Sequence, residues 1–386
     1  MIKVGIAGAR GLSAITGLRS IADVEITAIC DLNEDALDKM AAEQHIPHKY
    51  RVFEDMLDSD LDAVWIATPM QCHVPQTIAA LEAGKHVMSE VTAGVTMDEL
   101  WWLMECVEKY NKIYMFAENC CYAPQHQMVR ELLRRGILGE PYYAEGEYLH
   151  NCLHLLKYPN GKNSWRNYWQ LGTHGSFYPT HSIGPVMQWF DGDRIERVTC
   201  FGSGHHVRPD IRNEDTTVTM CQLKSGKLVK IRVDCISPRP LPSTTYFQLQ
   251  CTKGAYESPR GGGDSAKIWL ESFSDGSEKA EWHRLDDFQA YLPERYRQAT
   301  DKQRSAGHDG SDYFIVQDFI EAIKTGQQPE LDVYKACEWT AVALLSALSV
   351  TNNSRPMLMP DFRKNMPSAE QHLSLAAAEE QRSGKN

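Results

Sequence analysis

The feature that most constrains the fold is the alternation of short apolar runs with helical patterns over residues 1–118. The apolar runs are rich in β-branched residues, as in strands that helices cover on both faces. Alternation at this spacing predicts βαβ units, and therefore a parallel, doubly wound sheet. Thr96, followed three residues later by Glu99, predicts a capped helix start. The expected strands are residues 3–7, 25–30, 63–67, 86–88 and 113–117, and the expected helices include 74–83 and 97–110.

The pattern changes after residue 120, where strand-like segments are grouped and helices stand apart. This grouping predicts an α+β second domain built on an open, largely antiparallel sheet. Residues 224–227, Lys-Ser-Gly-Lys, predict a hairpin turn. We divide the chain into residues 1–119, 120–355 and a C-terminal tail, 356–386. The strands expected in the second domain are 142–148, 196–201, 216–223, 228–235 and 245–251, with helices at 123–135, 312–324 and 333–350.

Composition excludes several protein classes. The chain has 386 residues, which favours two domains, and 40 basic against 51 acidic residues give a net charge of −11. That balance argues against a nucleic-acid binder, and no apolar run approaches the roughly 20 residues that span a membrane. The 11 cysteines lack Cys-x-x-Cys spacing and are expected to be reduced thiols in a cytoplasmic enzyme. His205 and His206 lack nearby carboxylates at ligand spacing, so no metal site is expected.

A glycine-containing turn joins the first expected strand to the first helix. Gly8, Ala9, Arg10 and Gly11 form an imperfect G-x-G-x-x-G, because Arg10 occupies the middle glycine position. Such a turn lets the backbone approach a pyrophosphate at a helix N-terminus. Asp31 follows the second strand about 20 residues later, where a carboxylate binds the ribose and repels a 2′-phosphate, which favours NAD over NADP. The alternatives are a tight turn without a ligand and a helix N-cap at Asp31.

Residues 67–73, Ala-Thr-Pro-Met-Gln-Cys-His, and 79–87, Ala-Ala-Leu-Glu-Ala-Gly-Lys-His-Val, closely resemble the Gfo/Idh/MocA oxidoreductase superfamily. The resemblance covers residues 1–350 and implies a Rossmann domain followed by a substrate-binding α+β domain. It places Thr68, Pro69 and His73 beside the cofactor and Glu90 beside the nicotinamide ribose. The implied cofactor-binding residues are Gly8, Ala9, Arg10, Gly11, Asp31, Thr68, Pro69, His73, Glu90, Val91 and Asn119.

Two proton-transfer groups of the ordinary sugar dehydrogenases in this superfamily are absent. Those enzymes carry a lysine after the glutamate, whereas Val91 follows Glu90 here. Their catalytic histidine corresponds to His181, but Phe177 stands four residues earlier, in place of their aspartate. A valine cannot take a proton. Therefore either other residues perform this chemistry or the chain is no simple dehydrogenase.

Further motifs resemble the bacterial NAD-dependent α-N-acetylgalactosaminidases. They are Glu-Asn-Cys-Cys-Tyr at 118–122, Gly-Glu-Tyr-Leu-His at 146–150, Trp-Arg at 165–166, Phe-Tyr-Pro-Thr-His-Ser-Ile-Gly-Pro at 177–185, Ser-Pro-Arg-Pro at 237–240 and Gly-His-Asp-Gly at 307–310. The resemblance implies hydrolysis by transient oxidation at sugar C3, elimination across C1 and C2, hydration and re-reduction, with NAD regenerated. It assigns the reaction centre to Glu118, Tyr148, Tyr178 and His181, and the substrate contacts to His150, Trp165, Arg166, Arg239 and His308.

Within that mechanism, His181 is expected to take the C3 hydroxyl proton, and Tyr148 or Tyr178 the C2 proton. Each residue also has a purely structural alternative: a core histidine at His181, packing at both tyrosines, and a helix cap at Glu118. Leu241 follows Pro240 where the galactosaminidases have a tyrosine. N-acetylgalactosamine is therefore one candidate substrate, and an acidic sugar such as a sulfoquinovoside or uronide is another.

Two other functions stay open at the level of sequence. One is an NAD-dependent sugar dehydrogenase or glycoside 3-oxidase that releases NADH, with a tyrosine replacing the missing lysine. The other is a non-catalytic NAD or sugar sensor. In each case the expected partner is a small glycoside, with neither nucleic acid nor membrane. We expect a homo-oligomer, a dimer or tetramer, formed through the open face of the second sheet.

Overall fold

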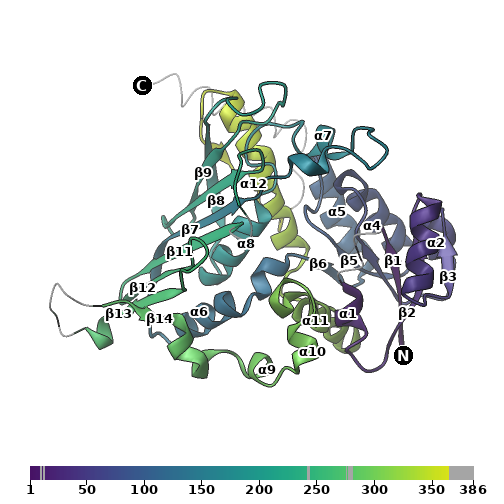
Figure 1. The fold of residues 1–386 in the computed structure, drawn as a ribbon, viewed down its shortest axis with the longest axis horizontal. Helices are drawn as coiled ribbons and strands as arrows, with labels where there is room; N and C mark the ends of the chain where they lie inside the picture. Colours follow the sequence, from purple (N-terminus) through teal and green to yellow (C-terminus); the bar gives the residue numbers. More distant parts are fainter. Residues whose placement is uncertain (9–10, 12–13, 241–243, 275, 277–280, 365–386) are drawn as a thin grey trace.

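Two sheets organise the molecule, which we describe from a computed structural model for residues 1–8, 11, 14–240, 244–274, 276 and 281–364. A six-stranded sheet is built from the N-terminal part of the chain, and a nine-stranded sheet from the rest (Figure 1). All 11 cysteines are free. The structure thus has the α/β class and the two kinds of sheet that the sequence predicts.

The first sheet is entirely parallel, with the strand order β3-β2-β1-β4-β5-β6. The order reverses between β1 and β4, which is where doubly wound sheets bind their ligands. All five expected strands are present. The sequence analysis missed β3, a three-residue edge strand. The bounds are β1 Ile2–Ala7, β2 Val24–Cys30, β3 His48–Tyr50, β4 Ala63–Ile66, β5 His86–Ser89 and β6 Tyr114–Phe116.

Helices connect these parallel strands. Helix α5 begins with the expected capping box: Glu99 N–H donates to Thr96 Oγ1 at 3.2 Å, and Glu99 Oε2 accepts from Thr96 N–H at 3.0 Å. Helix α2 is capped by Asn33 and not by Asp31. The bounds are α1 Ile15–Leu18, α2 Glu34–Glu43, α3 Phe53–Leu57, η2 Met70–Cys72, α4 His73–Glu82 and α5 Met97–Tyr110.

The second sheet has the strand order β14-β13-β12-β11-β7-β10-β9-β8-β15. Only the β7–β10 pair is parallel, since the other neighbours run antiparallel. The expected turn at residues 224–227 joins β9 to β10. The bounds are β7 Pro141–Leu149, β8 Ile195–Gly202, β9 Thr217–Leu223, β10 Leu228–Asp234, β11 Thr245–Cys251, β12 Gly254–Glu257, β13 Lys267–Leu270, β14 His283–Arg284 and β15 Met357–Leu358.

Helix α8 lies against β7, and this contact positions the site. A Cβ at Gly146 of β7 would lie 2.2 Å from the carbonyl oxygen of Ser182, so only glycine permits this approach. Helices α6, α8 and α12 lie on one side of the second sheet (Figure 1). The remaining bounds are η3 Asn119–Tyr122, α6 Pro124–Arg134, η4 Leu153–Leu155, α7 Arg166–Trp169, α8 Thr180–Trp189, η5 Glu271–Phe273, η6 Leu285–Tyr291, α9 Glu294–Arg297, α10 Asp301–Arg304, η7 His308–Gly310, α11 Ser311–Thr325 and α12 Val333–Thr351.

The last two long helices return to the first sheet. Helix α11 packs against α1 so closely that a Cβ at Gly17 would lie 2.8 Å from the carbonyl oxygen of Asp312. Helix α12 packs between α5 and β8. By length and composition alone, α12 could cross a membrane, but 67% of its apolar window is buried inside the fold, as in a core helix.

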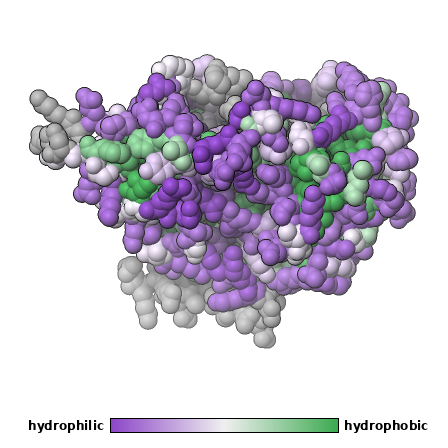
Figure 2. All heavy atoms as spheres, turned by 90° about the horizontal axis from the view of Figure 1, so that it is seen from below, coloured by the Kyte–Doolittle hydropathy of each residue, from purple (hydrophilic) through white to green (hydrophobic). Residues whose placement is uncertain are grey.

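The molecular surface is mainly polar. Figure 2 shows the molecule from below: hydrophilic residues cover most of this face, and hydrophobic residues gather toward the left and the right of the view. The main apolar core is continuous from the first sheet through α12 to the second sheet. A smaller core lies beside Tyr148 and Tyr178 and includes Cys152, Phe177 and Cys235.

Candidate active site

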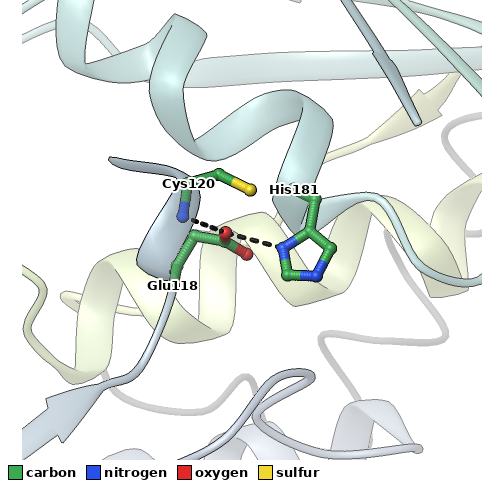
Figure 3. Close-up of side chains that lie close together, drawn as sticks. All are labelled: Glu118, Cys120 and His181. Atoms are coloured by element: carbon green, nitrogen blue, oxygen red, sulfur yellow. Dashed lines mark hydrogen bonds and ion pairs between the residues drawn. The ribbon is translucent and has the colours of Figure 1, made fainter. Parts of the chain in front are cut away.

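A carboxylate and an imidazole form a buried pair between the two sheets. Glu118 follows β6 at the N-cap of η3, and His181 lies in the first turn of α8. Nδ1 of His181 lies 2.7 Å from Glu118 Oε1 (Figure 3). The same oxygen accepts the Cys120 N–H at 3.2 Å. Glu118 therefore caps η3, as its structural alternative expects, and also contacts His181.

The environment of His181 makes its imidazole strongly basic. Its side chain is only 16% exposed, and that of Glu118 is fully buried. Burial alone would lower the pKa of His181, but the Glu118 carboxylate beside it, helped by Cys120, holds that pKa well above its ordinary value. Because Nδ1 is engaged by Glu118, Nε2 is the nitrogen left for a ligand.

Tyr148 and Tyr178 surround the histidine. Both ring centroids lie 5.0 Å from that of His181, and the two tyrosine rings are 5.8 Å apart. Burial raises the pKa of Tyr178 to about 12 and raises the pKa of Tyr148 well above its usual range. The Tyr148 hydroxyl lies 2.7 Å from Nδ1 of His150. The Tyr148 phenol, whose raised pKa opposes its ionisation, thus lies beside the His150 imidazole, which can act as a base.

His181 and Tyr178 line a cleft of about 240 Å³ between the two sheets, whereas Glu118, Tyr148 and His150 lie behind them and are not among the lining residues. Its lining joins segments that are far apart in the sequence, from the ends of β4 and β5 to the turn before α11. Ten residues predicted for the site lie in this lining: Thr68, His73, Glu90, Val91, Asn119, Trp165, Arg166, Tyr178, His181 and His308, together with Ala67 and Met70. Pro69 lies between two lining residues, at the N-cap of η2.

His73 supports the wall of the cleft. It is buried, and its two ring nitrogens lie 2.7 Å from the Thr92 carbonyl oxygen and 2.9 Å from that of Thr68. Burial lowers its pKa, and a neutral ring donates to one of these two carbonyl oxygens at a time, so the ring lies packed between the segment after β4 and the segment after β5. The geometry therefore indicates that His73 positions the backbone that lines the cleft.

The ends of β1 and β2 have the features of a dinucleotide site. Gly8 has φ +92°, and a Cβ there would lie 2.5 Å from the Ala67 carbonyl oxygen. Only glycine therefore makes this turn, which brings backbone close to the space where a pyrophosphate binds. Asp31 follows β2, and its Oδ1 accepts the Asn33 N–H at 2.8 Å. Gly11 is described, whereas Ala9 and Arg10 lie outside the described residues.

Asp312, at the start of α11, is a site residue that the sequence analysis missed. Nδ1 of His308 lies 3.0 and 2.9 Å from its two carboxylate oxygens, and Asn119 Nδ2 donates to Oδ1 at 3.2 Å. The hydrogen bond to Asp312 raises the pKa of His308. The i, i+4 spacing of His308 and Asp312 was a signal that could have found this pair.

Arg166 carries a positive charge into the cleft wall. Its guanidinium stacks 4.5 Å from the ring centroid of Trp165 and donates to Gln170 Oε1 at 2.5 Å. Among the ion pairs of the described residues, none involves Arg166. Arg239 is exposed and lines a different hollow beside β10, and Leu241 lies outside the part of the chain that the structure describes.

Both parts of the chain match known protein families. The model "Oxidoreductase family, NAD-binding Rossmann fold" matches residues 2–118, and "Glycosyl hydrolase 109, C-terminal domain" matches residues 122–367. The chain belongs to glycosyl hydrolase family 109. A "Glycosyl hydrolase family 109 protein" of Saccharopolyspora erythraea is 31% identical over 397 residues, covering 94% of this chain and 83% of that protein. An "Alpha-N-acetylgalactosaminidase" of Shewanella oneidensis is 28% identical over 403 residues, covering 94% and 85%.

Solved structures agree on the fold. Levoglucosan dehydrogenase in complex with NADH and L-sorbose superimposes with a TM-score of 0.79 at 18% identity, covering 94% of this chain and all of that one. An oxidoreductase domain protein from Kribbella flavida gives 0.78 at 19% identity, covering 93% and 99%. This family 109 protein is therefore an NAD-dependent enzyme, a glycosidase or sugar oxidoreductase.

Proposed function

We propose that the chain is a glycosidase that hydrolyses hexosides through transient oxidation at C3, elimination across C1 and C2, hydration and re-reduction. The observation that carries this proposal is the basic Glu118–His181 pair with Tyr148 and Tyr178 around it. His181 and Tyr178 line the cleft at the nucleotide end of the first sheet. Val91, where a dehydrogenase has lysine, is buried and offers no proton acceptor.

NAD, when bound, supplies reversible oxidation at the sugar C3 carbon. His181 takes the proton of the C3 hydroxyl at Nε2, because Glu118 holds the other nitrogen and makes the imidazole more basic. When the C3 ketone is re-reduced after hydration, the same imidazole returns its proton to the C3 oxygen. Glu118 acts through His181, by orienting it and stabilising the imidazolium that forms.

A tyrosine removes the C2 proton, which the neighbouring ketone has made acidic. Of the two candidates, Tyr148 has a partner able to accept its own proton, since its hydroxyl lies 2.7 Å from His150 Nδ1. Proton transfer from Tyr148 to His150 forms the Tyr148 phenolate, which burial otherwise disfavours, and this phenolate is the base that removes the C2 proton. Tyr178 lines the cleft directly and donates a hydrogen bond to the enolate oxygen.

We propose a hexoside with an acidic group or an N-acetyl group as the substrate. The Arg166 guanidinium in the cleft wall, stacked on Trp165 without an ion pair among the described residues, supports an acidic group. His308, whose pKa is raised by its hydrogen bond to Asp312, lies in the same wall and can donate a hydrogen bond to the substrate. Matched aryl glycosides of a sulfonated, a uronic and an N-acetylated sugar test this choice through their kcat/KM values.

A second candidate is an NAD-dependent sugar dehydrogenase or glycoside 3-oxidase. The observation in its favour is that the Tyr148–His150 pair could take an alcohol proton in place of a lysine. Incubation with aryl glycosides separates the two candidates. The glycosidase frees the aglycone with no net change in NADH absorbance, whereas the dehydrogenase accumulates NADH and leaves the glycosidic bond intact. A non-catalytic sensor would do neither.

We also propose a cytoplasmic homo-oligomer that pairs through the uncovered face of the second sheet. Along β9, Thr217, Thr219 and Cys221 are buried, while Val218 and Met220 between them remain partly exposed on the opposite face. Light scattering combined with Val218→Lys tests this assembly, since a charge on a paired face should dissociate it.

A further inference from the structure

Three different metal-ligating side chains converge at the buried pair. Glu118, Cys120 and His181 each offer one ligand atom, and these atoms all lie within 4.8 Å of one another. Figure 3 shows the Cys120 side chain extending toward the His181 ring, with the Glu118 carboxylate below it. A carboxylate, a thiol and an imidazole are the three kinds of side chain that bind Zn²⁺ in proteins.

A second observation points to a missing partner at the same place. Glu118 is completely buried, and its Oε2 has no hydrogen-bond partner among the described residues. An unsatisfied buried oxygen of this kind is costly, and a bound cation would satisfy it. Cys120 and His181 are partly exposed, and His181 lines the cleft, so an ion can reach the cluster from solvent.

We propose that Glu118, Cys120 and His181 bind one soft divalent cation, such as Zn²⁺ or Cd²⁺, and that the bound ion inhibits the enzyme. Three protein ligands leave a fourth position for water. On binding, the Cys120 thiol loses its proton to solvent and its sulfur forms the bond to the metal, with no change of oxidation state. Sequence spacing did not predict this site, because His181 lies 61 residues beyond Cys120.

Inhibition follows from which atoms the ion would occupy. The metal takes lone pairs of Glu118 and His181 that otherwise orient the imidazole and accept the substrate proton. This part of the inference rests on the proposed function, whereas binding of the ion does not. The two can therefore be tested separately, with one readout for binding and another for activity.

The binding test titrates the NAD-containing protein with Cd²⁺ after removal of adventitious metal. Calorimetry measures stoichiometry and affinity, and ultraviolet absorbance detects the sulfur-to-cadmium charge-transfer band. We expect one ion per chain with that band in the unmodified protein. Cys120→Ser should abolish the band and weaken binding by more than about tenfold. Cys72→Ser is the matched control, because Cys72 is also a partly exposed thiol and lies outside the cluster.

Glu118→Gln is the second variant, since it keeps the thiol and should still weaken binding while retaining a native melting curve.

In the activity test, Zn²⁺ should inhibit glycoside hydrolysis, a chelator should restore it, and Cys120→Ser should resist inhibition relative to its own metal-free rate. Absence of the band in the unmodified protein, or an equal band in Cys120→Ser, overturns the site. Activation by Zn²⁺ overturns the inhibitory role. Cadmium binding by a protein that hydrolyses no glycoside supports the site and counts against the proposed function alone.

Discussion

Replacing Glu118 by glutamine tests the origin of the basicity of His181. The substitution keeps the shape of the side chain and removes its charge from a 2.7 Å contact. Both side chains are largely buried, at 0% and 16% exposed, so solvent screens the interaction little. A hydrogen bond to a charged group contributes about 1.5–3 kcal/mol, and each 1.4 kcal/mol corresponds to about tenfold in rate. We therefore expect kcat/KM to fall about 10- to 150-fold.

The pH profile gives a second readout of the same substitution. The proton acceptor is neutral His181, so activity should rise with pH through the pKa of that group. Glu118 raises the pKa of His181, and its loss should therefore move the acidic limb of the kcat/KM profile toward lower pH. Steady-state release of aglycone from an aryl glycoside, measured across pH at saturating NAD, records both effects.

Glu338→Gln is the matched control for a buried glutamate. Glu338 of α12 accepts the Ile195 N–H at 3.2 Å and pairs with Arg194 at 3.6 Å, and it is not among the residues that line the cleft. That variant should lower the melting temperature and leave kcat/KM and its pH profile unchanged. An unaltered kcat/KM and profile in Glu118→Gln would refute the role assigned to the Glu118–His181 pair.

Four further outcomes are expected. His181→Ala should lower turnover by about 10²–10⁴, with NAD affinity and melting temperature nearly unchanged, and a normal rate with a lowered melting temperature would instead indicate a core histidine. Hydrolysis in deuterated water should place deuterium at C2 of the released sugar, as seen by proton NMR, and a fully protonated C2 would exclude the elimination mechanism. Asp31 should make NADP bind at least about tenfold more weakly than NAD in calorimetry, and equal affinities would contradict that role. Asp312 raises the pKa of His308, so the stability that their pairing contributes is fully present below the ordinary histidine pKa and is lost as pH rises through the raised pKa. The difference in melting temperature between the native protein and Asp312→Asn should therefore shrink as pH rises over that range.

The sequence predicted most of the fold because hydrophobic periodicity is strong in long or buried elements. The interior strands of the first sheet are mainly apolar, and α5 begins with a capping box that can be recognised in the sequence. The strand β3 was missed because its residues are His-Lys-Tyr, which form a short exposed edge without an apolar pattern. The strands β12, β13, β14 and β15 of the second sheet were also missed. The strands β14 and β15 are two residues long and exist only through tertiary pairing.

The residues of the candidate site were predicted through motif resemblance, and the structure adds contacts between them that sequence spacing cannot predict. Five of the ten predicted residues around the cleft follow strands of the first sheet, because the carboxyl ends of parallel strands meet at one edge of a sheet. The other five come from the second part of the chain and reach the cleft only through tertiary packing. The contact between Tyr148 and His150 depends on the way the chain leaves β7, and Cys120 joins His181 only after α8 has packed on β7. Sequence separation hides the second of these contacts, because Cys120 and His181 are 61 residues apart.

The return of α11 and α12 to the first sheet limits how this architecture can be divided. Thr340 of α12 accepts the Ala93 N–H at 3.1 Å, and the Phe116 N–H donates to the Leu331 carbonyl oxygen at 2.9 Å. Residues 1–119 taken alone would lose these partners and expose the apolar side of α5. A gene fragment that ends after β6 is therefore not a transplantable nucleotide-binding module. Chimeras between relatives should therefore exchange α11 and α12 together with the first sheet.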